Sequence, residues 1–297
     1  MYSSLTAFAY HEPERLQQAC TLLFECGPNA RVVAGGCDLL PAIRRRAVAP
    51  SALVSLARIP NLRGVQAGSA GLHILPMASL RAVEQCEPVR AKYTALFEGV
   101  HSIASVQVKT TGTLIGNVCV ATPASDISPP LMVLGAELDI LGPTGTRALP
   151  IDAVFAATKR TALERGEIVA AVRVPPPAPG TGSAFAKLTR TAADCAKINV
   201  AARVTLSGGR VNDVRIALGS VAAIPVRAPE AEASLAGGTL DDHAIEQAAR
   251  LAVDNTQPIT DVRSTAEYRQ RTLHVLLRRV LADARDRALE SQGSVTR

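Results

Sequence analysis

A run of proline and glycine divides the chain. Residues 175–182 read PPPAPGTG within a sequence of 297 residues. Proline lacks the backbone N–H that helices and sheets use, and glycine adds conformational freedom, so this run predicts a linker between domains. The length also suffices for about two domains of roughly 150 residues each. We therefore expect one domain before the linker and another after it.

The first part of the chain predicts a small, mostly parallel α/β layer. EPERLQQACTLLFECG at 12–27 indicates a helix with Pro13 in its first turn, because its apolar residues recur at helical spacing. The order that follows is a strand at 30–33, a glycine turn at 34–38, a short helix, and a strand at 52–56. Strands that alternate with helices favour a parallel sheet.

From residue 59 to 175 the pattern changes to short apolar runs separated by Gly, Pro, Asn and Asp. This punctuation is typical of strands joined by turns. The runs are LHILPMASL (72–80), GTLIGNVCV (112–120), AELDILGPTGTRALPI (136–151) and EIVAAVRVP (167–175). The third run predicts a hairpin, with GPTG as its turn.

The segment after the linker predicts an antiparallel sheet followed by helices. SAFAKLTR and NVAARVTLSGGRVNDVRIALGSV, within 183–221, indicate strands with a turn at SGGR. Three helical segments follow. The second places Ile245, Ala248, Ala249 and Ala252 on one stripe, and the third opens with a capping box from Ser264 to Glu267.

Composition excludes several classes of protein. The N-terminus has no basic segment followed by an apolar core, and no stretch approaches the about 18 apolar residues of a membrane helix. We therefore expect a cytoplasmic protein without a membrane span. The net charge is +6, but tryptophan is absent and aromatic residues total 3%, which leaves little for bases to stack on. We expect no nucleic-acid partner.

Metal-ligand and acid/base patterns are also missing. The histidines form no HExxH motif and the cysteines no CxxC pair, so we predict no metal ligand and no catalytic side chain. The histidines are His11, His73, His101, His243 and His274, and the cysteines are Cys20, Cys26, Cys37, Cys86, Cys119 and Cys195.

The glycine turn AGGCD, Ala34 to Asp38, lies between a predicted strand and a predicted helix. Glycines let the backbone approach a ligand closely, and the N-terminus of the following helix favours an anion. A tight β-to-α turn without a ligand explains the same residues. The segment does not match GxGxxG. It is not a Walker loop either, because no Gly-Lys dipeptide occurs in the chain.

A second loop of the same kind is VKTTGTLIGNVCVATPASD, residues 108–126. Thr113 and Asn117 offer side-chain hydrogen bonds, and Gly116 allows close backbone approach. Asp126 follows nine residues after Asn117. A threonine-rich strand with a bulge is the alternative. Two such loops in one chain favour a nucleotide-like ligand.

The order of these motifs resembles the medium subunits of molybdenum hydroxylases, the carbon monoxide dehydrogenase and xanthine dehydrogenase family. VVAGGCDLLPAIRRRAVAPSALVSLARIPNLRGV resembles the family's first flavin-binding segment. GTLIGNVCVATPASDISPPLMVLGAELDILGP resembles the second, which usually reads TIGGN followed by Pro-x-x-Asp. SAFAKLTRTAADCAKINVAARVTL and PITDVRSTAEYRQRTLHVLLRRVL resemble its C-terminal domain.

The resemblance implies an α+β fold. It consists of a p-cresol-methylhydroxylase-type FAD-binding domain over 1–175, with subdomains of about 1–58 and 59–175, a linker at 176–182, and a C-terminal domain of antiparallel sheet and helices at 183–290. The implied cofactor is FAD, bound between the first two subdomains. No cysteine-rich insert is present, so the resemblance implies no additional four-iron cluster.

The family's binding residues carry over to positions in both loops. The residues that the resemblance implies at the FAD pyrophosphate and ribityl chain are Ala34, Gly35, Gly36, Cys37 and Asp38 in the first loop, and Thr113, Leu114, Gly116 and Asn117 in the second. Asp126 would accept hydrogen bonds from cofactor hydroxyls, Lys187 would lie near the flavin edge, and an apolar contact would fall at about Ile168 or Val169.

Two residues depart from the family pattern. Ile115 stands where the first glycine of GGN is usual, so its backbone either has a negative φ or carries a steric cost. We expect its side chain to pack against the isoalloxazine or the adjoining subdomain. Cys37 replaces the more usual His, Thr or Ser, which weakens one hydrogen bond.

The function that the resemblance implies is that of a flavoprotein subunit of an oxidoreductase. A large partner subunit would carry the molybdenum pterin, and a small partner with two [2Fe–2S] clusters would relay electrons through FAD to NAD⁺, oxygen or a quinone. The assembly would be a dimer of heterotrimers. Two alternatives stay open at this point: an assembly scaffold with weak or lost FAD binding, and a stand-alone flavin oxidase.

Overall fold

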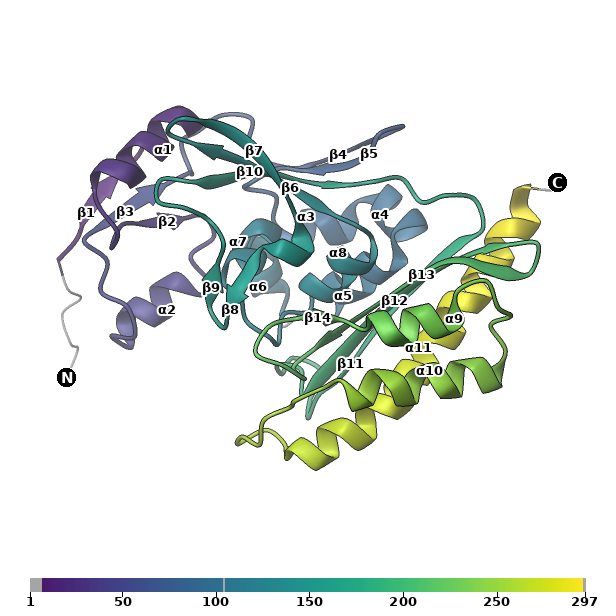
Figure 1. Ribbon diagram of the computed structural model, residues 1–297. Coiled ribbons are helices and arrows are strands. Elements are labelled where there is room, and N and C mark those ends of the chain that lie inside the picture. The colour runs from purple at the N-terminus through teal and green to yellow at the C-terminus, as the bar shows by residue number, and fades with distance from the viewer. Residues whose placement is uncertain (1–6, 104, 296–297) are drawn as a thin grey trace.

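The structure, a computed structural model, describes residues 7–103 and 105–295. Three regions follow one another along its length (Figure 1). A small α/β layer lies at one end, a larger sheet with short helices lies in the middle, and a second sheet covered by long helices lies at the other end. The predicted α+β fold is confirmed. Residues 1–6 belong to the N-terminus that was expected to lack a basic segment followed by an apolar core, and they lie outside the described residues.

The N-terminal layer is a parallel three-stranded sheet with the order β1-β3-β2. This confirms the predicted parallel layer. Its elements are β1 (Ala9–His11), α1 (Leu16–Glu25), β2 (Arg31–Val33), α2 (Leu39–Arg44) and β3 (Ala52–Ser55). The position predicted for Pro13 was wrong, because α1 begins three residues later, at Leu16. Strand β1 was not predicted.

The middle region contains an antiparallel sheet with the order β4-β5-β10-β6-β7. Its strands are β4 (Val65–Gly68), β5 (Gly71–Ile74), β6 (Glu137–Gly142), β7 (Gly145–Pro150) and β10 (Ile168–Val174). Strands β6 and β7 pair up to Gly142 and Gly145, which confirms the hairpin with its GPTG turn. A short helix η1 (Ile151–Ala153) leads to a small second hairpin of β8 (Phe155–Ala157) and β9 (Arg160–Thr161).

Short helices occupy much of the region that was predicted to form strands. They are α3 (Leu80–Gln85), α4 (Glu87–Lys92), α5 (Thr94–His101), α6 (Val106–Thr111), α7 (Leu114–Cys119) and α8 (Ser128–Val133). The strand predicted at GTLIGNVCV was wrong, because these residues form α7. The Oγ1 of Thr113 caps this helix by accepting the Gly116 N–H at 3.0 Å. The buried residues of α7, Leu114, Ile115 and Val118, lie on one helical face and not at the alternate positions of a strand.

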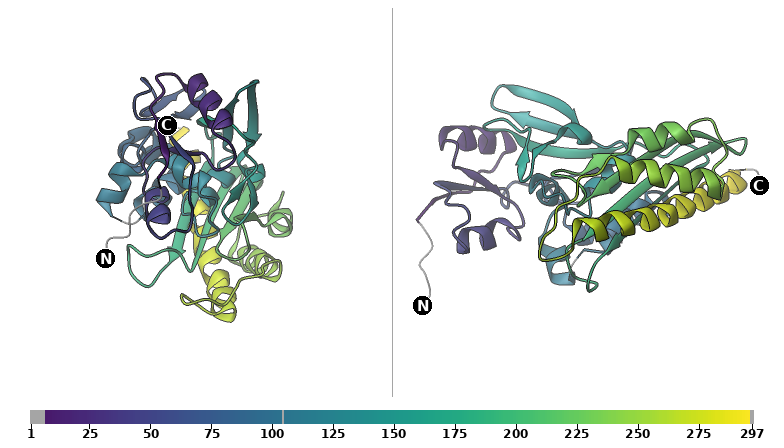
Figure 2. Two further views of the ribbon diagram at one scale, coloured as in Figure 1. Left: turned by 90° about the vertical axis from the view of Figure 1, so that its left-hand side faces the viewer. Right: turned by 60° about the horizontal axis from the view of Figure 1, so that its bottom comes forward.

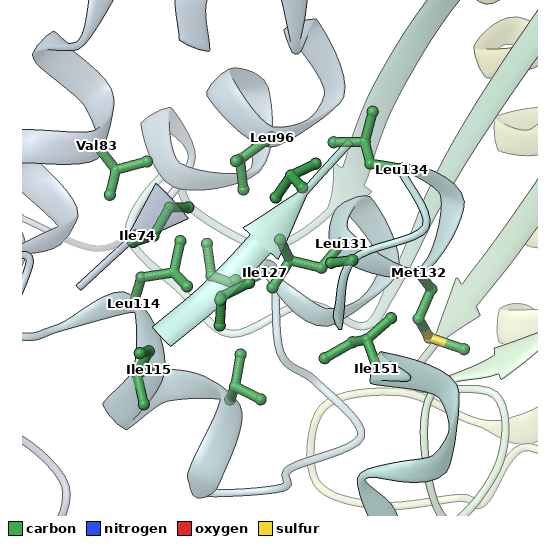
Figure 3. Packing of buried hydrophobic residues seen from close by; sticks show 14 of the residues in the cluster. Ile74, Val83, Leu96, Leu114, Ile115, Ile127, Leu131, Met132, Leu134 and Ile151 are labelled. Atoms are coloured by element: carbon green, nitrogen blue, oxygen red, sulfur yellow. The ribbon is translucent and has the colours of Figure 1, made fainter. Parts of the chain in front are cut away.

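The middle sheet and its helices enclose the largest apolar core. Figure 3 shows part of this cluster, in which Leu114 lies together with Ile74 and Ile127. The cluster also includes Phe185, Ala201 and other buried residues of the C-terminal sheet. The middle and C-terminal regions therefore share apolar packing.

The C-terminal region is an antiparallel sheet with the order β11-β12-β13-β14. Its elements are β11 (Thr181–Leu188), β12 (Ile198–Ser207), β13 (Arg210–Gly219), β14 (Val226–Arg227), α9 (Pro229–Leu235), α10 (Asp242–Asp254) and α11 (Ala266–Val295). The helices lie side by side over one face of this sheet (Figure 2). The predicted buried stripe of α10 is confirmed.

The predicted start of the last helix was wrong by one residue. The Oγ1 of Thr265 accepts the Tyr268 N–H at 3.2 Å, whereas the Ser264 N–H donates to Asp261 instead. A local turn between Asp261 and Ser264 therefore precedes the helix, and Thr265 occupies the cap position. Within the described residues, no helix combines the length and apolarity needed to cross a membrane.

Polar contacts join the C-terminal region to the middle region. The Oγ of Ser183 accepts the Ala95 N–H of the middle region at 3.2 Å. Within the C-terminal region, the guanidinium of Arg287 donates to the Ser183 carbonyl at 2.7 Å. Arg287 also donates to Glu98 at 2.5 Å, and the other oxygen of Glu98 accepts the Phe185 N–H at 2.8 Å. The domain boundaries expected from the sequence stay a prediction.

The contact between α11 and β11 leaves no room for a side chain at Gly182. A Cβ there would lie 2.2 Å from the Ala284 carbonyl oxygen. We therefore expect Gly182→Ala to lower the free energy of unfolding by about 2 kcal/mol or more, because the helix must move off the sheet. Urea unfolding followed by circular dichroism measures this. The control is Gly68→Ala, where a Cβ meets nothing within 4 Å; equal effects of the two variants would contradict the packing argument.

Candidate cofactor site

A cavity of about 460 Å³ lies where the N-terminal layer meets the middle region. Its wall is formed by β2 and the glycine turn after it, by α2, by residues 112–120, by the hairpin of β8 and β9, and by the start of β10. Both loops predicted to bind a ligand therefore face one cavity. Its volume falls within the roughly 300–1,000 Å³ of typical small-molecule sites.

The first loop presents unpaired backbone donors. Gly36 has φ +72, a left-handed conformation that suits glycine, and the chain turns there into α2. Among the residues that the structure describes, none accepts a hydrogen bond from the N–H groups of residues 35–38. Ala34, Gly35, Gly36, Cys37 and Asp38 all line the cavity. Such a set of free N–H groups suits an anion.

The two loops touch each other directly. A Cβ at Gly35 would lie 2.1 Å from the Thr111 carbonyl oxygen and 3.0 Å from the Gly112 Cα. Because only a residue without a side chain fits, the backbone of the second loop packs against that of the first. The two loops thus form one continuous part of the cavity wall.

The second loop adds side-chain donors. Thr113, Gly116 and Asn117 line the cavity. The Oδ1 of Asn117 accepts a hydrogen bond from the Ser125 hydroxyl at 2.8 Å, and this contact fixes the orientation of the amide. Its NH₂ group has no acceptor among the described residues and can donate to a ligand.

Three predicted site residues do not line the cavity. Leu114 is fully buried in the apolar core. Asp126 and Lys187 form a buried ion pair, with 2.7 Å between Oδ2 and Nζ, and the Asn199 amide donates to the other carboxylate oxygen at 2.9 Å. Burial raises the pKa of Asp126, and the neighbouring Lys187 ammonium and Asn199 amide act in the opposite direction. A contact of these three residues with a cofactor stays a prediction.

Ile115 has a negative φ because it lies inside α7, so its backbone carries no steric cost. Its side chain is 6% exposed and belongs to the apolar core (Figure 3). It also lines the cavity. Ile168 and Val169, the predicted apolar contact, line the cavity as well. Burial, followed by the charge of Asp38, raises the pKa of the Cys37 thiol, which favours its neutral form.

Sequence reasoning missed part of the wall. Lys159, Thr161 and Leu163 come from or follow the β8–β9 hairpin, and Pro76 follows β5. Strands of two or three residues leave no usable periodicity, and only the tertiary fold brings them to the loops.

A charge cluster around the buried Glu84–Lys109 pair lies behind the second loop. The carboxylate of Glu84 on α3 accepts from Lys109 at 2.6 Å, from Arg81 at 2.7 Å and from His101 at 2.9 Å. Desolvation acts to raise the pKa of Glu84, but the hydrogen bonds from Lys109, Arg81 and His101 outweigh it and lower that pKa to about 2. The Lys109–Glu84 pair joins α6 to α3, and α6 leads directly into Thr113.

The cavity wall fits a dinucleotide such as FAD. The free N–H groups of residues 35–38 suit phosphate oxygens, and Thr113 and Asn117 can bond to hydroxyl groups. The apolar side chains of Ile115, Ile168 and Val169 suit a ring system. No cluster of three or more His, Cys, Asp or Glu residues that could hold a metal ion occurs within the described residues.

This combination of fold and cavity is that of a protein that can hold a dinucleotide. Residues 6–177 match the family described as FAD binding domain in molybdopterin dehydrogenase. Residues 183–284 match the CO dehydrogenase flavoprotein C-terminal domain. The chain belongs to the family of FAD-binding medium subunits of molybdenum hydroxylases. It is an oxidoreductase subunit whose cofactor is FAD.

Individual relatives match nearly end to end. The carbon monoxide dehydrogenase medium chain of Afipia carboxidovorans is 35% identical over 95% of this chain and 98% of its own. The xanthine dehydrogenase FAD-binding subunit of Escherichia coli O157:H7 is 27% identical over 93% and 95%. Among solved structures, a carbon monoxide dehydrogenase chain from Hydrogenophaga pseudoflava superposes with a TM-score of 0.92 at 34% identity, over 96% of this chain and 99% of that one. The resemblance inferred from the sequence is confirmed.

The contact between the loops predicts the effect of Gly35→Ala. The added Cβ would overlap the Thr111 carbonyl oxygen at 2.1 Å and push the loops apart. We expect FAD affinity to fall by about tenfold or more, which corresponds to roughly 1.4 kcal/mol or more, while circular dichroism shows a retained fold. Titration of the apoprotein with FAD measures the affinity. Gly238→Ala, where a Cβ makes an ordinary 3.6 Å contact, serves as the control; wild-type affinity in Gly35→Ala would contradict the account.

The depressed pKa of Glu84 predicts an acid-dependent loss of stability. A carboxyl group with a pKa of about 2 in the folded protein and about 4.5 when unfolded stabilises the fold above pH 4.5, and this stabilisation is lost as the pH falls toward 2. The difference in unfolding free energy between wild type and Glu84→Gln should therefore shrink by on the order of 3 kcal/mol between pH 5 and pH 2. Urea unfolding across this range tests it, and a difference independent of pH would refute it.

Proposed function

We propose that this chain is the FAD-binding electron-transfer subunit of a multi-subunit molybdenum hydroxylase or dehydrogenase. One observation carries the proposal: two loops far apart in the sequence, at 34–38 and 112–117, meet in one cavity, and the N–H groups of 35–38 have no acceptor among the described residues. The relatives named as medium chains of such enzymes support it. The cytoplasmic location expected from the sequence stays a prediction.

In this proposal the residues that line the cavity bind and orient FAD. The N–H groups of residues 35–38 bind the pyrophosphate, and Thr113 and Asn117 donate to the ribityl chain. Ile115 and Ile168 cover apolar ring surface and exclude water from it. No side chain of this chain is assigned a proton-transfer step.

The partners that we propose are those of the family. When bound, FAD supplies a redox centre that accepts electrons one at a time and passes two to an acceptor. A small subunit with two [2Fe–2S] clusters would deliver these electrons, and a large molybdenum-pterin subunit would oxidise the substrate. The acceptor would be NAD⁺, oxygen or a quinone, and the assembly a dimer of heterotrimers.

Neither alternative function gains support. A scaffold that has lost FAD was considered because Ile115 replaces a glycine, but Ile115 fits its helical position without a positive φ. No specific observation favours the stand-alone oxidase. Both are outcomes that the following experiment separates.

Reconstitution tests the proposed function in two stages. The purified full chain, mixed with FAD and desalted, should retain flavin absorption bands in the visible range. Co-expressed with its molybdenum and iron–sulfur subunits, it should elute with them as one complex whose flavin band bleaches when substrate is added. A chain that retains no flavin would refute the flavoprotein assignment. A chain that retains flavin, oxidises substrate and reacts with oxygen alone would favour the stand-alone oxidase.

A further inference from the structure

The turn between β8 and β9 places a lysine in the wall of the cavity. Thr158 and Lys159 connect the two strands, and Lys159 lines the cavity. The hairpin is anchored at this point, because the Lys159 N–H donates to the Ala121 carbonyl at 2.7 Å and the Thr158 hydroxyl donates to the Ala223 carbonyl at 2.7 Å. The backbone of Lys159 is therefore held against Ala121, which lies within the second loop.

The conformation of Lys159 is unusual for its residue type. Its φ is +59, in the left-handed region that glycine and asparagine adopt most readily. A lysine kept at such a position carries a backbone cost that a glycine would not. Lys159 also lines the cavity, so its side chain can contact a ligand there.

Three other charged side chains line the cavity, namely the cation Arg31 and the anions Asp38 and Glu167. The Arg31 guanidinium donates to the carbonyls of Pro28 and Ala30, and the Glu167 carboxylate is paired with Arg147 at 2.7 Å. Asp38, in the glycine loop itself, has no cationic partner within the part of the chain that the structure describes. It would repel a ligand phosphate bound to the same loop.

The ammonium of Lys159 is available for that compensation. It has no hydrogen-bond or ion-pair partner among residues 7–103 and 105–295. An ammonium group on a flexible stem binds phosphate as a point charge, and a charge-assisted hydrogen bond is about twice as strong as a neutral one. The neighbouring Arg160 is also exposed but does not line the cavity.

We propose that Lys159 is a further cofactor-binding residue, whose ammonium pairs with the anionic diphosphate of FAD and offsets the charge of Asp38. The inference rests on the proposed function and adds to it a cationic side chain from outside the two loops. The same chemistry could serve the diphosphate of a nucleotide acceptor such as NAD⁺. The experiment therefore measures FAD binding directly, without an acceptor.

Affinity and its salt dependence test the charge pairing. FAD is titrated into the full-length apoprotein of the wild type, Lys159→Met and Arg160→Met. We expect Lys159→Met to weaken binding about tenfold and Arg160→Met to stay within about twofold of wild type. Raising the salt concentration should weaken FAD binding less in Lys159→Met than in wild type, because one ionic contact is gone. Equal affinities in the two variants, or an unchanged salt dependence in Lys159→Met, would overturn the proposal.

A glycine variant separates binding from folding. Lys159→Gly relieves the positive φ, so its apoprotein should melt at the same temperature as wild type or higher, while FAD binding weakens as it does in Lys159→Met. A lysine that only supports the hairpin would give a lower melting temperature with unchanged FAD affinity, which would contradict the inference. Failure of the wild type itself to bind FAD would instead refute the proposed function.

Discussion

The contact between Gly35 and the Thr111 carbonyl is the constraint on which the cofactor site depends. A Cβ at Gly35 would lie 2.1 Å from that oxygen, so the first loop can meet the second only as glycine. The first loop belongs to a parallel layer and the second to a set of short helices, and each has its own core. This contact makes them one surface, with unpaired N–H groups on one side and Thr113 and Asn117 on the other.

The rest of the middle region keeps that surface in place. Thr113 pairs with Ser79, and Gly112 and Leu114 exchange backbone hydrogen bonds with the start of α3. Behind them, the buried Lys109–Glu84 pair joins α6 to the same helix. The Asp126–Lys187 pair likewise joins the end of the second loop to β11. In the proposed function these side chains position FAD, and FAD would carry the redox chemistry.

The sequence predicted the parts of the fold whose patterns are long or chemically distinctive. The parallel layer, the β6–β7 hairpin, the C-terminal strands and the stripe of α10 follow from periodicity and turn residues. Helices α3–α8 did not, because six to eight residues are too few to separate a helix from a strand. In the candidate site, the loop glycines could be recognised from the sequence, whereas Lys159 reaches the cavity only through the tertiary fold. The contacts of Asp126 and Lys187 with the cofactor stay a prediction, and in the structure the two side chains pair with each other.

Amide hydrogen exchange tests the central claim, that both loops form one FAD-binding surface, most directly. The N–H groups of residues 35–38 have no acceptor within the described chain, so they should exchange quickly in the apoprotein. Adding FAD should slow exchange at 35–38 and at 113–117 together, over the same range of FAD concentration. Protection of only one loop, or of neither, would contradict the account.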